Sequence, residues 1–188
     1  MSQVSFENRT VIVTGAGNGL GKAYALDLGS RGAKVVVNDL GGAVDGSGSG
    51  STPADEVVNE IIANGGEAVA NYDSVATKEG GASIVQTAID NFGTVDAVVN
   101  NAGILRDKSF ANMSEEELSL IIDVHLKGTF FVSQPAFKVM KENAYGRIVN
   151  VASPSGLFGN FGQSNYGAAK MGIVGLTNVL AIEGAKYN

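Results

Sequence analysis

The sequence has 188 residues, of which 44% are hydrophobic, and a formal net charge of -6. This length lies within the usual range of one domain, about 50–250 residues. With no cysteine and a single histidine, a disulfide framework, a thiolate zinc site and a multi-histidine metal centre are excluded, so we expect no metal. Lys and Arg are scattered, which argues against a nucleic-acid partner. The first residues lack a signal-peptide pattern and no run of about 18 apolar residues occurs, so we expect a cytoplasmic protein without membrane contact.

Short β-branched runs alternate along the chain with longer segments in which apolar residues recur every three or four positions. These patterns are typical of strands and helices, respectively. The predicted strands are residues 10–14, 34–38, 67–71, 95–100 and 147–151, and the predicted helices are residues 20–31, 54–64, 80–92, 114–142 and 165–187. The alternation predicts an α/β fold of the Rossmann type, with a doubly wound parallel sheet in a three-layer αβα arrangement. Ligands bind beyond the carboxyl ends of the strands in such a sheet.

The longest predicted helix contains both a start signal and a kink signal. Ser114 followed by Glu117 is a capping box. Pro135 lacks a backbone donor and should kink the helix. Earlier in the chain, residues 41–50 (GGAVDGSGSG) have the composition of a flexible linker. They lie too near the amino terminus to mark a domain boundary, so we expect one domain.

A glycine-rich turn follows the first predicted strand, in residues 14–21 (TGAGNGLG). Its glycines allow the backbone to approach a pyrophosphate, and the helix that begins there supplies N–H donors and the positive end of its dipole. The alternative is a tight turn without a ligand. The position between a strand and a helix favours a phosphate-binding turn.

Asp39 ends the second predicted strand, 24 residues after Gly15. An acidic residue about 20 positions after the turn accepts hydrogen bonds from the adenosine ribose in dinucleotide-binding folds. A carboxylate there would repel the 2′-phosphate of NADP, and the adjacent residues offer no Arg or Lys to compensate. We therefore predict NAD as the cofactor. The alternative is that Asp39 is a solvated turn residue.

Tyr166 and Lys170 stand four residues apart near the start of the last predicted helix, which places both side chains on one face. A nearby ammonium stabilises the phenolate form of a tyrosine, which then serves as a base toward an alcohol. Ser153 follows the fifth predicted strand, where its hydroxyl could hold a substrate oxygen. Each residue alone has a structural alternative, and for Ser153 this is a turn serine bonded to local backbone.

The glycine-rich turn, Asn100–Gly103, Ser153 and the segment from Tyr166 to Lys170 together resemble short-chain dehydrogenases/reductases. This resemblance implies catalysis by Ser153, Tyr166 and Lys170, with Ser153 also binding the substrate. It places residues 74–75 near the adenine. The residues that it implies for NAD binding are Gly15, Asn18, Gly19, Leu20, Gly21, Asp39, Asp73, Ser74, Val75, Asn101, Ala102, Gly103, Tyr166 and Lys170.

Four further segments, residues 38–42, 71–75, 102–107 and 159–163, narrow the resemblance to the (3R)-hydroxyacyl-CoA dehydrogenase domains of peroxisomal multifunctional enzymes type 2 and their bacterial homologues. The implied reaction is oxidation of a (3R)-3-hydroxyacyl-CoA to the 3-oxoacyl-CoA with NAD, in the peroxisome where the domain is part of a eukaryotic multifunctional enzyme. The sequence shows no basic cluster for the phosphates of coenzyme A. A ketone, sugar-alcohol or steroid dehydrogenase and a non-catalytic NAD-binding fragment remain as alternatives.

The sequence departs from the family pattern at two places. His125 stands where the wider family has a catalytic Asn, and the narrower subgroup resembles this chain in having His; a packed, backbone-bonded histidine is the alternative. Family members continue beyond the position of Asn188 with two further strands and a substrate-covering segment. We therefore expect residues 1–188 to be one NAD-binding domain that is truncated at its carboxyl end, with an exposed fifth strand. Helices 114–142 and 165–187 resemble those that pair in family dimers, so we expect a homodimer or homotetramer.

Overall fold

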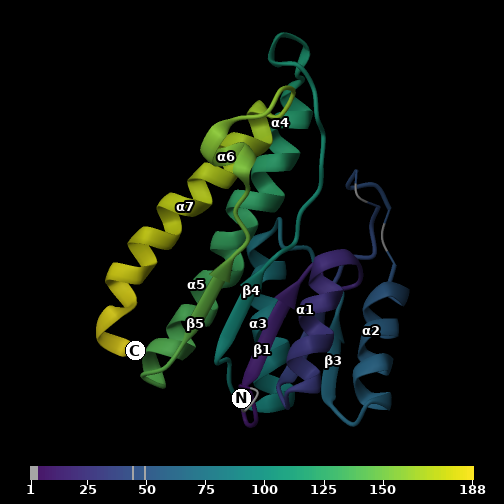
Figure 1. The fold of residues 1–188 in the computed structure, drawn as a ribbon, viewed down its shortest axis with the longest axis vertical. Coiled ribbons are helices and arrows are strands. Elements are labelled where there is room, and N and C mark those ends of the chain that lie inside the picture. The colour runs from purple at the N-terminus through teal and green to yellow at the C-terminus, as the bar shows by residue number, and fades with distance from the viewer. Residues whose placement is uncertain (1–3, 44, 49) are drawn as a thin grey trace.

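The computed structural model describes residues 4–43, 45–48 and 50–188, and Figure 1 shows a single sheet flanked by helices. The five strands are β1 (Thr10–Thr14), β2 (Lys34–Asn38), β3 (Glu67–Asn71), β4 (Ala97–Asn100) and β5 (Arg147–Asn150). The α-helices are α1 (Gly19–Ser30), α2 (Thr52–Ala63), α3 (Lys78–Phe92), α4 (Glu115–Ile121), α5 (Gly128–Glu142), α6 (Pro154–Phe158) and α7 (Ser164–Gly184). The short helical segments are η1 (Phe110–Asn112), η2 (Ile122–Lys127) and η3 (Ala185–Tyr187).

All strand pairs are parallel, and the strand order is β3-β2-β1-β4-β5. The order reverses on either side of β1, which confirms the predicted doubly wound sheet. β4 begins two residues after the predicted start at Val95. The backbone of Asp96 nevertheless bonds to Thr10 and Arg147 on the neighbouring strands, so the pairing extends almost to the predicted position.

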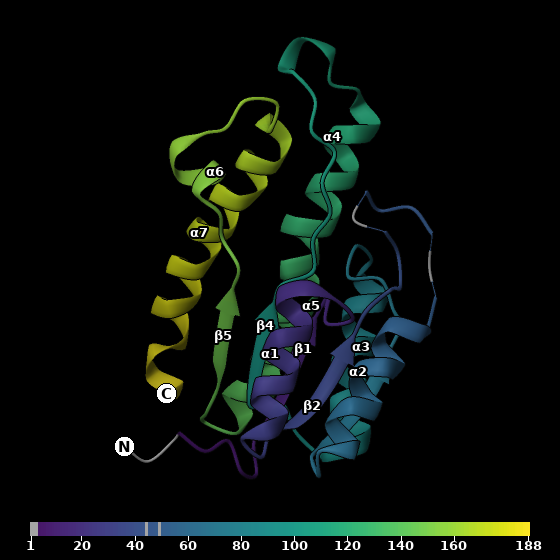
Figure 2. The same cartoon turned by 45° about the vertical axis from the view of Figure 1, so that its right-hand side comes forward.

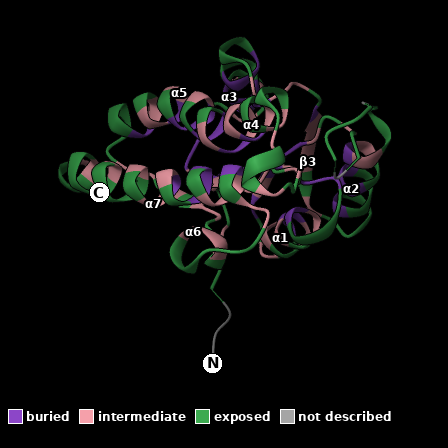
Figure 3. Ribbon diagram, turned by 90° about the horizontal axis from the view of Figure 1, so that it is seen from above, coloured by how far each residue is buried: buried purple, intermediate pink, exposed green. Residues whose placement is uncertain are grey.

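Two hydrophobic clusters fill the spaces on the two faces of the sheet. Val11 and Val35 point toward α1 and α2, whereas Ile12 and Val36 point toward α3 and α5. This alternation follows from the two-residue period of a strand, and each fully buried Val or Ile contributes about 1.5–3 kcal/mol. Figure 3 shows buried positions between the helical layers and exposed positions on the outer surfaces. The three-layer arrangement is therefore the predicted one.

The predicted continuous helix over residues 114–142 is wrong in one respect. The segment contains α4, then six residues of π-helix in η2, and then α5. The predicted capping box is confirmed, because Ser114 and Glu117 exchange both side-chain-to-backbone hydrogen bonds. Pro135 lies inside α5. A π-helical insertion changes the turn by one residue and leaves the apolar spacing nearly intact, which explains why the sequence pattern did not reveal it.

The carboxyl-terminal half contains a short helix, α6, that the apolar pattern did not predict. α7 lies beside β5, as Figures 1 and 2 both show, and it also contacts α4. β5 forms one edge of the described sheet, and its Val149 is 53% exposed.

The glycine- and serine-rich segment follows β2. Val44 and Ser49 of this segment lie outside the described residues. Its Gly46 lies against the side chains of Ile104 and Leu120. Among the described residues, no helix combines the length and apolar character that a membrane span requires.

Candidate active site

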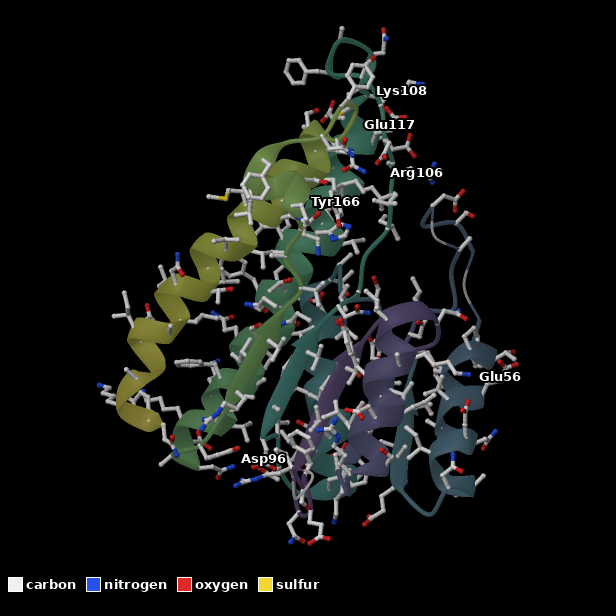
Figure 4. All side chains as sticks on the ribbon, in the orientation of Figure 1. Glu56, Asp96, Arg106, Lys108, Glu117 and Tyr166 are labelled. Carbon is white, nitrogen blue, oxygen red and sulfur yellow. The ribbon has the colours of Figure 1, made fainter. Side chains whose placement is uncertain are left out.

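The predicted functional residues gather at the carboxyl ends of the strands. Figure 4 shows Tyr166 beyond that end of the sheet, near Arg106 and Glu117, whereas Asp96 lies at the opposite end. This is the edge at which parallel α/β sheets bind ligands. The arrangement brings together side chains from the β1–α1 turn, the segments after β2 to β5 and the first turns of α7.

The β1–α1 turn has the shape of a phosphate cradle. Asn18 is the N-cap of α1 and has an extended backbone, and Gly19, with φ +54°, has open space around the position of a Cβ. A Cβ on Gly21 would lie 2.1 Å from the carbonyl oxygen of Gly15, so only glycine allows the turn to fold this tightly. Leu20 is 63% exposed beside the turn. The free N–H groups at the start of α1 fit the pyrophosphate of a dinucleotide.

Asp39 connects the cradle to the segment after β2. Its Oδ2 accepts a hydrogen bond from the N–H of Gly17 at 2.8 Å, and its Oδ1 accepts one from Gly41 at 2.7 Å. Each carboxylate oxygen retains a lone pair that could accept a ribose hydroxyl. The carboxylate is half-buried and held by two backbone amides, so it is oriented before any ligand binds.

Asn101, predicted as a cofactor contact, stabilises the backbone of the cradle. Its Nδ2 donates to the carbonyl oxygens of Thr14 and Gly15, at 3.0 and 3.1 Å. Thr14 Oγ1 in turn accepts the N–H groups of Asn101 and Ala102, both at 3.1 Å. Ala102 also lies directly beneath Gly15. These bonds use the Asn101 amide donors within the protein, so its side chain shapes the turn.

The three predicted cofactor residues after β3 have different environments. Asp73 Oδ2 accepts hydrogen bonds from Asn71 and Ser83, which fixes it at the end of the strand. Ser74 Oγ accepts the N–H of Ala76 at 3.2 Å. Val75 is 8% exposed and belongs to the core. Of the three, Val75 therefore has the side chain least accessible to a ligand in this structure.

Tyr166, Lys170 and His125 form a compact group. The Lys170 Nζ lies 5.6 Å from the centre of the Tyr166 ring, and the His125 ring meets the Tyr166 ring edge-on at 5.0 Å between centroids. Lys170 is 3% exposed, and its Nζ donates to the carbonyl oxygen of Val151, just after β5. Gly103 lies against the His125 ring, where a Cβ would come within 2.5 Å of Cε1. The predicted pairing of Tyr166 with Lys170 is thus present in the geometry.

Burial governs the charges of this group. It lowers the pKa of Lys170 to about 8, because the ammonium loses hydration. It also lowers the pKa of His125 to about 4, and the charge of Lys170 adds to this effect, whereas a hydrogen bond with Ile104 opposes it. His125 is therefore neutral near pH 7. Its Nε2 contacts the backbone N–H and carbonyl of Ile104 at 3.1 and 2.8 Å, and its Nδ1 has no hydrogen-bond partner within the described part of the chain.

Ser153 is the N-cap of α6, and its Oγ accepts the N–H of Ser155 at 3.2 Å. α6 packs closely on the first turns of α7, and a Cβ on Gly167 would come within 3.0 Å of the Ser155 carbonyl oxygen. This close packing brings Ser153 to the same end of α7 as Tyr166. Among the described residues, the hydroxyl of Ser153 only accepts a hydrogen bond, so its hydrogen remains available to a ligand.

The sequence pattern indicated no role for the side chains of two polar residues in this region, Gln163 and Asn165. Gln163 bonds to Ser155 and Asp107 at 2.8 Å each, which joins the α6–α7 connection to the segment after β4. Asn165, 1% exposed, bonds to three backbone groups of other segments and of its neighbour Tyr166. Gln163 closes the segment 159–163 that supports the narrower resemblance, and Asn165 belongs to none of the quoted segments. For both residues, only the fold shows the hydrogen-bond partners.

This fold and this group of side chains are typical of nucleotide-binding oxidoreductases. Residues 9–188 match the sequence profile of the short chain dehydrogenase family. The chain belongs to this family and is an oxidoreductase. Members of the family use NAD or NADP, and the match does not distinguish the two.

Similar proteins come from fungi, animals and mycobacteria. The peroxisomal hydratase-dehydrogenase-epimerase of Saccharomyces cerevisiae is 61% identical over 98% of this chain, which corresponds to 20% of that protein. The peroxisomal multifunctional enzyme type 2 of Mus musculus is 58% identical over 100% of this chain and 25% of its own length. A short-chain type dehydrogenase/reductase of Mycobacterium tuberculosis is 60% identical over 97% of this chain and 64% of its length. The chain thus spans less than two thirds of these relatives.

Solved structures agree with the fold. A short chain dehydrogenase from Mycobacterium avium superposes with a TM-score of 0.90 at 49% identity, over 96% of this chain and 64% of that structure. The full-length peroxisomal multifunctional enzyme type 2 of Drosophila melanogaster superposes with a TM-score of 0.82 at 48% identity. The superposition covers 98% of this chain and 30% of the Drosophila chain.

Proposed function

We propose that the chain is an NAD-dependent dehydrogenase domain that oxidises (3R)-3-hydroxyacyl-CoA to 3-oxoacyl-CoA. The observation that carries the proposal is the Tyr166–Lys170 pair, with the buried Lys170 Nζ close to the Tyr166 ring at the carboxyl end of the sheet. The resemblance to multifunctional enzymes supports the acyl-CoA substrate.

The proposed mechanism assigns one task to each side chain. Ser153 donates its hydroxyl hydrogen to the substrate oxygen, and Tyr166, as phenolate, takes the alcohol proton. The charged form of Lys170 stabilises the phenolate. A nicotinamide cofactor bound there would supply the acceptor for the hydride of the carbinol carbon, which turns the alcohol into a ketone as its proton passes to Tyr166. Neutral His125, packed edge-on against Tyr166, limits the rotation of the phenol ring.

The cradle and Asp39 would hold the cofactor. The N–H groups at the start of α1 suit the pyrophosphate, and Asp39 suits the ribose hydroxyls that NAD presents. Asn101 and Ala102 support the turn through Thr14. The residues after β3 would border the adenine. We propose NAD over NADP because the Asp39 carboxylate would repel a 2′-phosphate.

A substrate panel tests this proposal. NADH formation would be measured with (3R)- and (3S)-3-hydroxydecanoyl-CoA, with a simple secondary alcohol and a steroid alcohol, and with NADP in place of NAD. We expect activity with the (3R) thioester and NAD. Preference for the steroid or the simple alcohol would favour the alternative of another dehydrogenase of this family. NAD binding without turnover of any substrate would favour a non-catalytic NAD-binding fragment.

We propose that the chain forms a single NAD-binding domain and that α5 and α7 pair in a homodimer or homotetramer, with exposed apolar residues such as Phe130, Val179 and Ile182 as contacts. Light scattering at micromolar concentration tests the assembly, and a monomeric mass would contradict it. We propose a peroxisomal location if the chain is part of a multifunctional enzyme, as the peroxisomal relatives suggest, and a cytoplasmic location if it is not. Cell fractionation distinguishes the two locations.

A further inference from the structure

A single buried side chain ties the first turn of α7 to two distant segments. Asn165 is 1% exposed, and its Nδ2 donates to the carbonyl oxygens of Arg106 and Glu117, at 3.1 Å each. Its Oδ1 accepts the N–H of Tyr166 at 2.7 Å. All three partners are backbone groups. The arrangement therefore depends on the Asn165 amide and not on the side chains around it.

The segment over residues 104–108, named the wall below, follows β4 and is held by backbone contacts at alternate residues. His125 contacts the backbone of Ile104, Asn165 contacts the carbonyl of Arg106, and the N–H of Lys108 donates to Gly162 at 2.8 Å. Figure 4 shows Arg106 and Lys108 on the same side of the molecule as Tyr166. Asn165 is the member of this set that bonds to both the wall and Tyr166.

We propose that Asn165 is a positioning residue that fixes Tyr166 relative to the wall over residues 104–108. The proposal rests on the acid–base role proposed for Tyr166. A buried amide needs all of its hydrogen-bond partners, so Asn165 cannot move without displacing the wall, α4 or the first turn of α7. Loss of the amide would release the backbone of Tyr166 at its N–H, whereas the cradle and Asp39 would keep their contacts.

The test compares two substitutions with a matched control. Asn165→Ala removes all three hydrogen bonds, whereas the isosteric Asn165→Asp keeps the acceptor for Tyr166 and loses the donors to the wall and α4. Asn150→Ala is the control, because Asn150 also cross-links α7, through Thr177, and accepts a bond from Asn100, away from Tyr166. For each purified enzyme, kcat and KM with (3R)-3-hydroxydecanoyl-CoA, the Kd of NADH and the melting temperature would be measured.

We expect both Asn165 variants to lose about ten- to a hundredfold in kcat, because a displacement of about 1 Å costs about a hundredfold in rate. The Kd of NADH should change less than about threefold, and Asn150→Ala should lower the melting temperature while keeping kcat. If the alanine variant does not fold, Asn165→Asp decides the question. Wild-type kcat in a folded Asn165 variant, or an equal loss of kcat in the Asn150 control, would overturn the positioning role.

A Tyr166→Phe variant separates this inference from the proposed function. Full activity of that variant would refute the proposed chemistry, whatever Asn165 does. An inactive Tyr166→Phe enzyme beside fully active Asn165 variants would refute the positioning role alone.

Discussion

Replacement of Asp39 by Asn should weaken the preference for NAD over NADP. The 2′-phosphate of NADP would lie near this carboxylate, and two unit charges about 4 Å apart repel by about 4 kcal/mol at an effective dielectric constant of about 20. Asp39 is half-buried, so solvent and salt screen part of this repulsion. We therefore expect the substitution to weaken the discrimination against NADP by about 1.4–2.8 kcal/mol. This corresponds to a ten- to hundredfold change in the ratio of kcat/KM with NAD to kcat/KM with NADP.

The same substitution also has a structural cost. The amide of Asn accepts through one oxygen only, so the N–H of Gly17 or of Gly41 would face an NH2 group. A half-buried unpaired donor costs about 1–3 kcal/mol, and the melting temperature should therefore fall. Initial rates with NAD and NADP at equal ionic strength give the ratio. The control is Asp27→Asn, which removes the carboxylate of a surface ion pair with Arg31. This substitution should leave the ratio unchanged. An unchanged ratio in Asp39→Asn would refute the assignment of Asp39 as the discriminating residue.

Three further predictions concern packing and charge. Gly21→Ala should lower both the melting temperature and the affinity for NADH measured by titration, because the added Cβ would clash with the carbonyl oxygen of Gly15. This holds although alanine favours helices over glycine. Wild-type values in the variant would contradict the close approach of the two residues. The pKa of His125 lies at about 4 in the folded state and near 6.5 when unfolded, so the unfolded chain binds more protons below pH 7. The free energy of unfolding, measured by urea titration, should therefore fall by about 2 kcal/mol from pH 7 to pH 5. His125→Gln should remove that part of the decline, and an equal decline in the variant would refute the effect of His125. The pKa of Lys170 lies at about 8 rather than 10.5, so the free energy of unfolding should rise between these pH values as the unfolded chain loses its extra proton; a Lys170→Met variant with the same rise would contradict the effect of burial.

The sheet was predictable because strands buried on both faces appear as continuous apolar runs. Val11 to Val13 and Val35 to Val37 are such runs, and the structure places all of them in the core. The glycine-rich turn and the four-residue spacing of Tyr166 and Lys170 were equally visible, because both depend on local sequence.

Interactions between distant segments were not predictable. Nothing near Asn165 in the sequence indicates the carbonyls of Arg106 and Glu117, since these lie more than 40 residues away and are backbone groups. The helix α6 was missed because five residues give no apolar period, although Ser153 followed by Pro154 is an N-cap with proline at the first helical position and could have indicated it.

The Gly/Ser-rich segment likewise had the composition of a linker. The structure nevertheless places Gly46 against Ile104 and Leu120, a contact that composition could not indicate. Composition describes the freedom of a segment in isolation, whereas its contacts depend on which elements the fold brings beside it.

In the proposed reaction, Tyr166 exchanges the proton while the cradle and Asp39 hold NAD. NADH formation from (3R)-3-hydroxydecanoyl-CoA by the wild-type and Tyr166→Phe enzymes, with NADH binding measured in parallel, tests it most directly. We predict a loss of about 10²- to 10⁴-fold in kcat in the variant, with a much smaller change in the Kd of NADH. Wild-type turnover in Tyr166→Phe would contradict the account.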